Sequence, residues 1–339
     1  MSASSRVRAR VAISCSIATF GLAGALPIAL TAAAQQPEHR PANHIALEQY
    51  LDWEDVQSPQ LSPDGTQVLF TRRWVDKMND KWESSIWLMN ADGSHQRSLT
   101  QGSDVKWAPD GKRIAYVAKG EPSGQQIFVR WMDAEGATTQ ISHLTDAPSA
   151  LEWSPDGKAI AFNANVPVQQ AFRIPMPAAP KGAKWVDNPK IVTRLNYRSD
   201  RVGYTDDYYR HIFVVPSEGG TARQISKGDW NYSAPEFSAD GKMIYYSGLF
   251  EPNSELAYRK SNIYAVNVAT GETKQITHRN GSAGQPVVSP DGKLVAFISA
   301  DSGDHSAWAE SKLYIMNADG GNVHLASGEL DRPIAGVMW

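Results

Sequence analysis

Short segments in which apolar and polar residues alternate recur along the chain, and the same turn joins them in pairs. Leu151, Glu152 and Trp153 precede a Ser-Pro-Asp-Gly turn, and the alternating segment 159–162 follows it. Alternation with a period of two predicts β-strands, because successive side chains of a strand point to opposite faces. Versions of this twelve-residue stretch begin at Pro59, Val105, Leu151, Pro235 and Pro286.

The turn itself predicts a tight hairpin. Proline in the second position has its φ angle already set, serine in the first position can bond the backbone ahead, and glycine in the fourth tolerates a left-handed conformation. This chemistry fits a type I turn. Each copy is therefore expected to join two antiparallel strands.

A second predicted hairpin follows each copy. Residues 86–100, 127–142, 212–226, 263–277 and 313–327 each read as a strand, a polar turn and another strand. Each unit is thus expected to hold four strands. The turn aspartate recurs at positions 64, 110, 156, 240 and 291, at intervals of 46, 46, 84 and 51 residues.

Four-stranded units repeated every 40–50 residues are typical of β-propeller blades, which bury their faces against one another. The alternative is a sandwich, but sandwiches do not repeat one turn motif at fixed intervals. The fold is therefore predicted as all-β, an incomplete propeller over 59–339 with about five blades. Residues 335–339 resemble the start of a sixth. The bulky residues before the turns are expected to pack between blades: Trp107, Trp153, Phe237 and Trp339.

The interval of 84 residues indicates an insertion of about 38 residues, placed at 164–211 between the second and third strands of the third unit. It begins rich in proline and becomes dense in arginine, tyrosine and aspartate. Long insertions on a rigid scaffold often carry binding. The candidate substrate-binding residues are Arg194, Tyr197, Arg198, Asp200, Arg201, Tyr204, Asp206 and Asp207. The alternative is a structural hairpin cross-linked by its own Arg–Asp pairs.

The first 34 residues read as a secretory signal peptide. Arg6, Arg8 and Arg10 precede an apolar stretch, and three alanines at 32–34 fit a cleavage site. The alternative is a membrane anchor, since about twenty residues can just span a bilayer. Cleavage would leave a periplasmic or secreted protein, with a lead-in segment at 35–58 before the propeller.

Composition narrows the possible chemistry. The single cysteine, Cys15, lies in the signal segment, so no disulfide, thiol nucleophile or cysteine-ligated metal is expected after cleavage. The remainder has 30 basic and 36 acidic residues, a net charge of −6, which argues against a nucleic-acid partner. Nothing after residue 34 is apolar enough to span a membrane.

No catalytic or cofactor motif stands out in the sequence. It contains no G-x-S-x-G, no H-E-x-x-H and no phosphate or dinucleotide loop. The turn aspartates lack the alternating ligands of a calcium loop. We therefore assign no catalytic residue, no metal and no cofactor.

Several stretches resemble a known family when taken together. After the signal segment come "LEQYLDWEDVQSPQLSPDG", the repeated units, "YRSDRVGYTDDYYRHIFVVPSEGGTARQIS" and "LDRPIAGVMW". The chain resembles the N-terminal propeller of exported bacterial serine peptidases of the prolyl oligopeptidase family, such as dipeptidyl aminopeptidases and acylaminoacyl peptidases. The resemblance covers residues 45–339 and implies that the propeller gates and selects short peptides for an α/β-hydrolase domain.

The sequence departs from that family in having no hydrolase domain and no catalytic triad. The chain is therefore expected to be the truncated propeller part of such a peptidase, inactive alone, with the peptide as its partner through the missing domain. Open blade faces would also allow self-association. The alternative function is a stand-alone periplasmic binding propeller of the TolB type.

Overall fold

The computed structural model describes residues 45–133, 136–168, 177–186, 191–200, 202–205, 208–252, 254–257, 260–300 and 309–339. The predicted signal segment 1–34 lies outside these ranges. The chain divides into two units, Met1–Leu47 and Glu48–Trp339, and every sheet lies in the second. In the described part of the chain, no helix combines the length and hydrophobicity needed to cross a bilayer.

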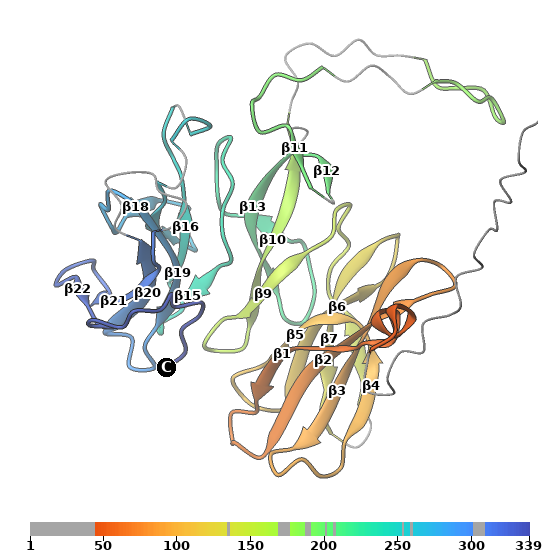
Figure 1. Ribbon diagram of the computed structural model, residues 1–339, viewed down its shortest axis with the longest axis horizontal. Helices are drawn as coiled ribbons and strands as arrows, with labels where there is room; N and C mark the ends of the chain where they lie inside the picture. Colours follow the sequence, from red (N-terminus) through yellow and green to blue (C-terminus); the bar gives the residue numbers. More distant parts are fainter. Residues whose placement is uncertain are drawn as a thin grey trace, which may run out of the picture. The chain divides into compact units, whose positions relative to one another are not determined.

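Among the described residues, five four-stranded antiparallel sheets follow a short 3-10 helix, η1 (Leu47–Asp52) (Figure 1). The first two sheets comprise β1 (Asp55–Leu61), β2 (Gln67–Asp76), β3 (Lys81–Asn90) and β4 (Arg97–Gln101), then β5 (Ser103–Trp107), β6 (Arg113–Lys119), β7 (Gln125–Trp131) and β8 (Thr138–Gln140). The third comprises β9 (Ser149–Trp153), β10 (Ala159–Pro167), β13 (Tyr208–Pro216) and β14 (Arg223–Gln224).

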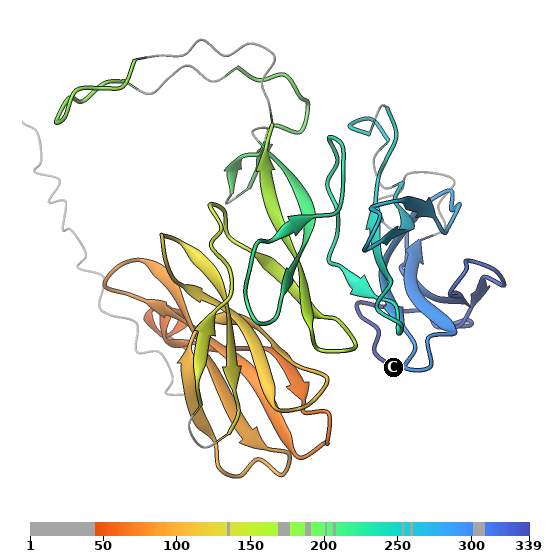
Figure 2. The same ribbon diagram turned by 180° about the vertical axis from the view of Figure 1, so that it is seen from behind.

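The fourth sheet comprises β15 (Glu236–Phe237), β16 (Met243–Gly248), β17 (Asn262–Asn267) and β18 (Thr273–Gln275), and the fifth β19 (Ser282–Val288), β20 (Leu294–Ala300), β21 (Lys312–Asn317) and β22 (His324–Leu325). Neighbouring strands in each sheet are consecutive along the chain apart from the insertion, as Figure 2 shows from behind. The four-stranded units predicted from the repeat are confirmed. The first strand begins at Asp55, inside the segment predicted as a lead-in.

The repeated turn has the predicted geometry. In the third sheet, Gly157 N donates to Ser154 O at 2.8 Å, and Gly157 has a φ of +67°. Ser154 Oγ donates to Asp156 Oδ1 at 2.7 Å and accepts from Ala159 N at 2.9 Å. The serine and aspartate therefore fasten the turn to the first residue of the next strand.

Three of the bulky residues before the turns, Trp107, Trp153 and Phe237, pack onto the preceding sheet. Trp153 is 4% exposed and shares a core cluster with second-sheet residues such as Val117 and Ile127. Trp107 likewise joins a cluster with residues of the first sheet, and Phe237 one with residues of the third. Because aromatic side chains bury a large apolar area, these three residues contribute strongly to the stability of the core. The prediction of packing between sheets is confirmed for Trp107, Trp153 and Phe237, whereas Trp339 is 47% exposed.

Each sheet packs on the next one along the chain. Contacts join the first strands of successive sheets, β1 with β5, β5 with β9, β9 with β15 and β15 with β19. Within the described ranges, no such strand packing joins the fifth sheet to the first. Leu61, the first sheet's counterpart of Trp107, is 58% exposed. The described sheets thus form an incomplete propeller.

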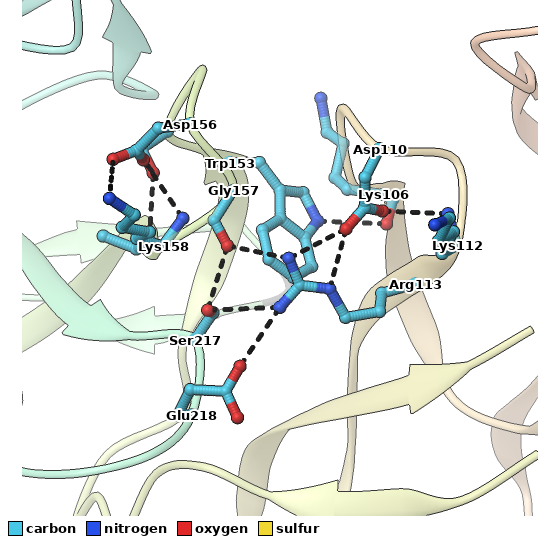
Figure 3. A network of polar contacts seen from close by, with 12 residues as sticks. Lys106, Asp110, Lys112, Arg113, Trp153, Asp156, Gly157, Lys158, Ser217 and Glu218 are labelled. Atoms are coloured by element: carbon cyan, nitrogen blue, oxygen red, sulfur yellow. Dashed lines mark hydrogen bonds and ion pairs between the residues drawn. The ribbon is translucent and has the colours of Figure 1, made fainter.

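Arg113 of β6 links the second sheet to the third (Figure 3). Its side chain is 10% exposed and donates to Gly157 O at 3.0 Å and Ser217 Oγ at 3.4 Å in the third sheet. Within its own sheet it donates twice to Asp110 Oδ2, at 2.9 and 3.1 Å. The guanidinium also lies over the ring of Trp153, 5.1 Å from its centroid. One buried cation thus joins three turns and an inter-sheet tryptophan.

Candidate functional site

The insertion extends from one end of the third sheet. Strands β10 and β13 pair over nine residues, from Ala159↔Pro216 to Pro167↔Tyr208, and the inserted segment connects them. It carries the short strands β11 (Arg198–Ser199) and β12 (Gly203–Tyr204), which pair with each other (Figure 1). The insertion therefore lies between the second and third strands of the third unit.

A cavity of about 1030 Å³ lies where the insertion meets the third and fourth sheets. Its walls come from five parts of the chain: the start of β9 with the connection before it, β10 and β13, the insertion, the connection into β15 and the connection from β16 to β17. Charged and aromatic lining residues are Arg194, Tyr208, Tyr209, Arg210, Asp229, Trp230 and Glu255, and amides are supplied by Asn165, Asn196 and Asn231. Pockets of this size accept small ligands.

Arg194 is the inserted residue whose side chain is most firmly placed in the cavity wall. Its Nη2 donates to Thr205 O at 2.8 Å, and its guanidinium lies 4.6 Å from the centre of the Tyr209 ring. Stacking and this hydrogen bond hold the guanidinium plane in place. Its Nε is buried and has no hydrogen-bond partner among the described residues. A buried unpaired donor of this kind favours an acceptor supplied by a ligand.

Hydrogen bonds tie the insertion and β13 to the fourth sheet's connections. Leu195 N donates to Glu255 Oε2 at 3.1 Å. Arg210 N donates to Asn231 Oδ1 at 2.9 Å, and Arg210 Nε donates to Tyr232 O at 3.0 Å. These contacts join residues up to 60 positions apart in the sequence. The cavity is therefore a product of how two sheets pack.

His211 follows Arg210 on β13 and is buried. Its Nδ1 lies 2.9 Å from Ser226 Oγ, and its ring lies 5.3 Å from that of Tyr232. Burial lowers the pKa of His211, so the imidazole is neutral near pH 7. The residue packs between the sheets and adds no charge there.

The candidate residues predicted from the sequence separate into three groups. Arg194 lines the cavity. Tyr197 and Tyr204 pack their rings 6.0 Å apart across the small β11–β12 hairpin, while Arg198 and Asp200 are exposed on it, and none of these four lines the cavity. Arg201, Asp206 and Asp207 lie outside the described residues.

The alternative of a hairpin cross-linked by its own Arg–Asp pairs stays a prediction, because Arg201, Asp206 and Asp207 lie outside the described residues. Sequence reasoning missed Trp230, Asn231 and Glu255, which come from the fourth sheet's connections. Nothing in their local sequence marks them, because only sheet packing places them beside Arg194.

The lining has the chemistry of a site for a short polar chain. It offers cations, carboxylates, amides and flat aromatic surfaces within one cavity, which suits the carbonyls, amides and charged ends of a peptide. Within the described part of the chain, no three histidine, aspartate or glutamate side chains gather as a metal site would require.

Residues 179–303 match the profile of the dipeptidyl peptidase IV N-terminal region. The chain is 26% identical over 196 residues to an uncharacterized peptidase, YuxL, of Bacillus subtilis, covering 57% of this chain and 29% of the relative. It is 25% identical over 291 residues to dipeptidyl-peptidase 5 of Porphyromonas gingivalis, covering 76% of this chain and 39% of the relative. The chain thus spans less than half the length of either relative.

Solved structures agree on the fold. The acylaminoacyl peptidase of Pyrococcus horikoshii superposes with a TM-score of 0.65 at 17% identity, covering 85% of this chain and 41% of that one. A protein described as a putative TolB from Agrobacterium tumefaciens superposes with a TM-score of 0.50 at 21% identity, covering 80% of each chain. The peptidase thus superposes with the higher TM-score, while this chain covers a larger share of the TolB structure.

Proposed function

We propose that this propeller, of the type that forms the N-terminal part of prolyl oligopeptidase family peptidases, gates and selects short peptides for an α/β-hydrolase domain. The match over residues 179–303 and the likeness to dipeptidyl-peptidase 5 support this function. The observation that carries the proposal is the cavity of about 1030 Å³ where the insertion meets the fourth sheet.

Arg194 is the residue proposed to hold the peptide. Its unpaired Nε can donate to a peptide carbonyl or carboxylate, while Tyr209 keeps the guanidinium plane fixed. A donor held in place in the free protein loses little conformational entropy when the ligand binds. Asp229 lines the same cavity and is exposed, so its carboxylate can accept from the peptide's amino group.

The test is calorimetric titration of the purified chain with dipeptides and tripeptides, together with an assay for peptide hydrolysis. We expect binding without hydrolysis, and a Kd at least tenfold weaker for Arg194→Ala. Arg194→Lys should also bind more weakly, because an ammonium lacks the planar fork that stacks on Tyr209. Arg97→Ala is the matched control, since Arg97 is exposed on β4 of the first sheet and lines no part of the cavity.

Unchanged affinity in Arg194→Ala would refute the assignment of Arg194. Failure of the wild-type chain to bind any peptide at millimolar concentration would refute the proposed peptide site. Hydrolysis blocked by a serine-directed phosphonate would overturn the proposal that catalysis lies outside this chain.

A stand-alone binding propeller of the TolB type is the second candidate. The observation favouring it is that the Agrobacterium structure and this chain each cover 80% of the other. The reading frame of the gene beyond the codon for Trp339 separates the two candidates. Further strand repeats followed by G-x-S-x-G would support the peptidase, and a stop codon would support the binding propeller.

We also propose that the protein is exported, with cleavage near Gln35. This proposal rests on the order of charged, apolar and small residues in positions 1–34. Mass spectrometry of periplasmic material should find a mature N-terminus close to residue 35. A membrane-bound product that retains the first 30 residues would contradict this proposal.

A further inference from the structure

Charged residues recur at one position of the repeat on the first strands of the sheets. Lys106, Glu152 and Glu236 each lie immediately before the bulky residue that precedes the turn. Their strands β5, β9 and β15 contact one another in that order, and β15 contacts β19. The repeat therefore places one ionisable side chain on each of three neighbouring strands.

These side chains bond from one sheet to the next. Lys106 Nζ donates to Glu152 Oε2 at 3.1 Å, joining the second sheet to the third. Glu236 Oε1 accepts from Val288 N at 3.1 Å, joining the fourth to the fifth. Asp104 Oδ2 accepts from Leu151 N at 3.1 Å, a second bond between β5 and β9. All four charged side chains are partly buried.

The carboxylates of Asp104, Glu152 and Glu236 all interact electrostatically with the ammonium of Lys106. Burial raises the pKa of Asp104 and of Glu152. Burial, and then the charge of Glu152, raise the pKa of Glu236 from 4.5 to about 7. Burial opposes the charge on Lys106, but Glu152 and the other carboxylates outweigh it and raise the pKa of the lysine, which stays charged. Like charges in a poorly solvated site disfavour ionisation of both.

The other strands packed against Glu236 bring no compensating cation. Strand β19 contains no ionisable side chain. On β16, Tyr245 lies opposite Glu236 in the register, and its hydroxyl donates to Ala318 O at 2.8 Å. Burial raises the pKa of Tyr245, so this phenol stays neutral. Lys106 is therefore the cation that Glu236 and Glu152 both face.

We propose that Lys106, Glu152 and Glu236 form a pH-sensitive fastener between successive sheets, tight at mildly acidic pH and looser at neutral pH. Protonated Glu236 still accepts the hydrogen bond from Val288 N. Its charge no longer repels Glu152 or competes with Glu152 for Lys106. Ionised Glu236 restores the repulsion inside the seam. The pH around the protein would then set how firmly the sheets that form the cavity hold together.

The sign follows from linkage. A carboxyl whose pKa is higher in the folded than in the unfolded chain contributes stability below its unfolded value, and that contribution is lost as the pH rises through the folded value. For Glu236 the window runs from 4.5 to about 7. Across it, the unfolding equilibrium constant of the wild type should rise roughly ten- to a hundredfold more than that of a variant that cannot titrate there.

The test compares Glu236→Gln with the wild type by urea unfolding and by hydrogen exchange of residues 282–288, from pH 5 to pH 8. Glutamine keeps the acceptor for Val288 N and removes the charge. We expect Glu236→Gln to match the wild type near pH 5 and to be more stable and better protected in β19 at pH 8. Glu272→Gln, at an exposed turn position, is the control and should follow the wild type.

A second variant keeps the proposal testable if Glu236→Gln folds poorly. In Glu152→Gln the neighbouring negative charge is gone, so the loss of β19 protection should move to lower pH. The proposal is overturned if β19 protection in the wild type does not change between pH 5 and pH 8, or if it changes equally in Glu236→Gln. Peptide binding does not enter this test, so its outcome is independent of the proposed function.

Discussion

Trp339 makes the same indole hydrogen bond to the fifth sheet that Trp153 makes to the second, although Trp339 is 47% exposed and Trp153 4%. Trp339 Nε1 donates to Val287 O at 2.9 Å, and Trp153 Nε1 donates to Lys106 O at 3.2 Å. Val287 and Lys106 occupy the same position of the repeat, directly before the residue that precedes the turn. The prediction that residues 335–339 begin another repeat thus agrees with where Trp339 docks, although no strand forms there.

Replacing Trp153 and Trp107 in turn with phenylalanine should reveal how much the indole hydrogen bond of Trp153 contributes to the free energy of unfolding. Trp153→Phe should lose about 1 kcal/mol more than Trp107→Phe, since a typical hydrogen bond contributes about that much. Trp107 is equally a core residue, but its indole nitrogen is buried without a partner in the described structure. Urea unfolding with unchanged m-values measures the difference, and equal losses for the two variants would contradict it.

Replacing Arg113 should destabilise the fold even when the new residue is lysine. Arg113→Ala removes both hydrogen bonds to Asp110 Oδ2 and one of the two bonds to the Gly157 carbonyl, which keeps its bond from Ser217 Oγ, at a cost of about 2–4 kcal/mol. Arg113→Lys should recover less than half of that, because an ammonium cannot reach both turns and also stack on Trp153. Thermal and urea unfolding measure both variants. Full recovery by lysine would show that only the charge matters.

The turn aspartates should make the fold sensitive to acid. Hydrogen bonds from Ser154 and from the Lys158 amide lower the pKa of Asp156, and the same pattern lowers those of Asp64, Asp240 and Asp291. A lowered pKa contributes stability above the unfolded value that is lost as the pH falls through the folded one. Asp156→Asn should therefore show a shallower fall in Tm below pH 4 than the wild type. An identical fall would contradict this.

Two glycines in equivalent turns should respond differently to alanine. Gly93 and Gly320 both follow Asn-Ala-Asp and have φ angles of +85° and +95°. A Cβ on Gly93 would meet open space, whereas one on Gly320 would lie 2.6 Å from Ile276 O of the fourth sheet. Gly93→Ala should cost about 1 kcal/mol for the backbone alone, and Gly320→Ala at least about 2 kcal/mol more. Equal Tm losses would show that the fourth and fifth sheets do not approach so closely.

The exposed face of the first sheet is expected to drive self-association. Leu61 is 58% exposed and Val56 65% exposed, whereas Trp107 at the position equivalent to Leu61 is 9% exposed. Uncovered apolar surface of this kind promotes association. Light scattering after size exclusion should show oligomers that Leu61→Glu weakens without lowering Tm. A monomeric wild type that binds no dye for apolar surface would contradict the prediction.

The sequence alone determined the four-stranded units and their turns. In the four turns that begin with serine, the serine, aspartate and glycine bond within five residues of one another, so their geometry depends on local sequence and repeats wherever the motif does. Alternation also predicted the strand that holds Ile160 and Phe162, both fully buried, but not that Ala161 between them is buried as well, because sheets cover both faces of the strand. The same locality allowed the insertion to be located from one irregular interval.

Tertiary structure decided which charged residues meet. Lys106 and Glu152 lie 46 residues apart, and Leu195 and Glu255 lie 60 apart, so no local pattern pairs them. Arginine and tyrosine density pointed to the insertion, but Arg194 is the one described residue of the predicted set that lines the cavity, because the third sheet and the connections of the fourth supply most of its wall. Hairpin geometry follows from backbone bonds within a unit, whereas the cavity and the inter-sheet charges follow from packing between units, which the single-unit pattern does not specify.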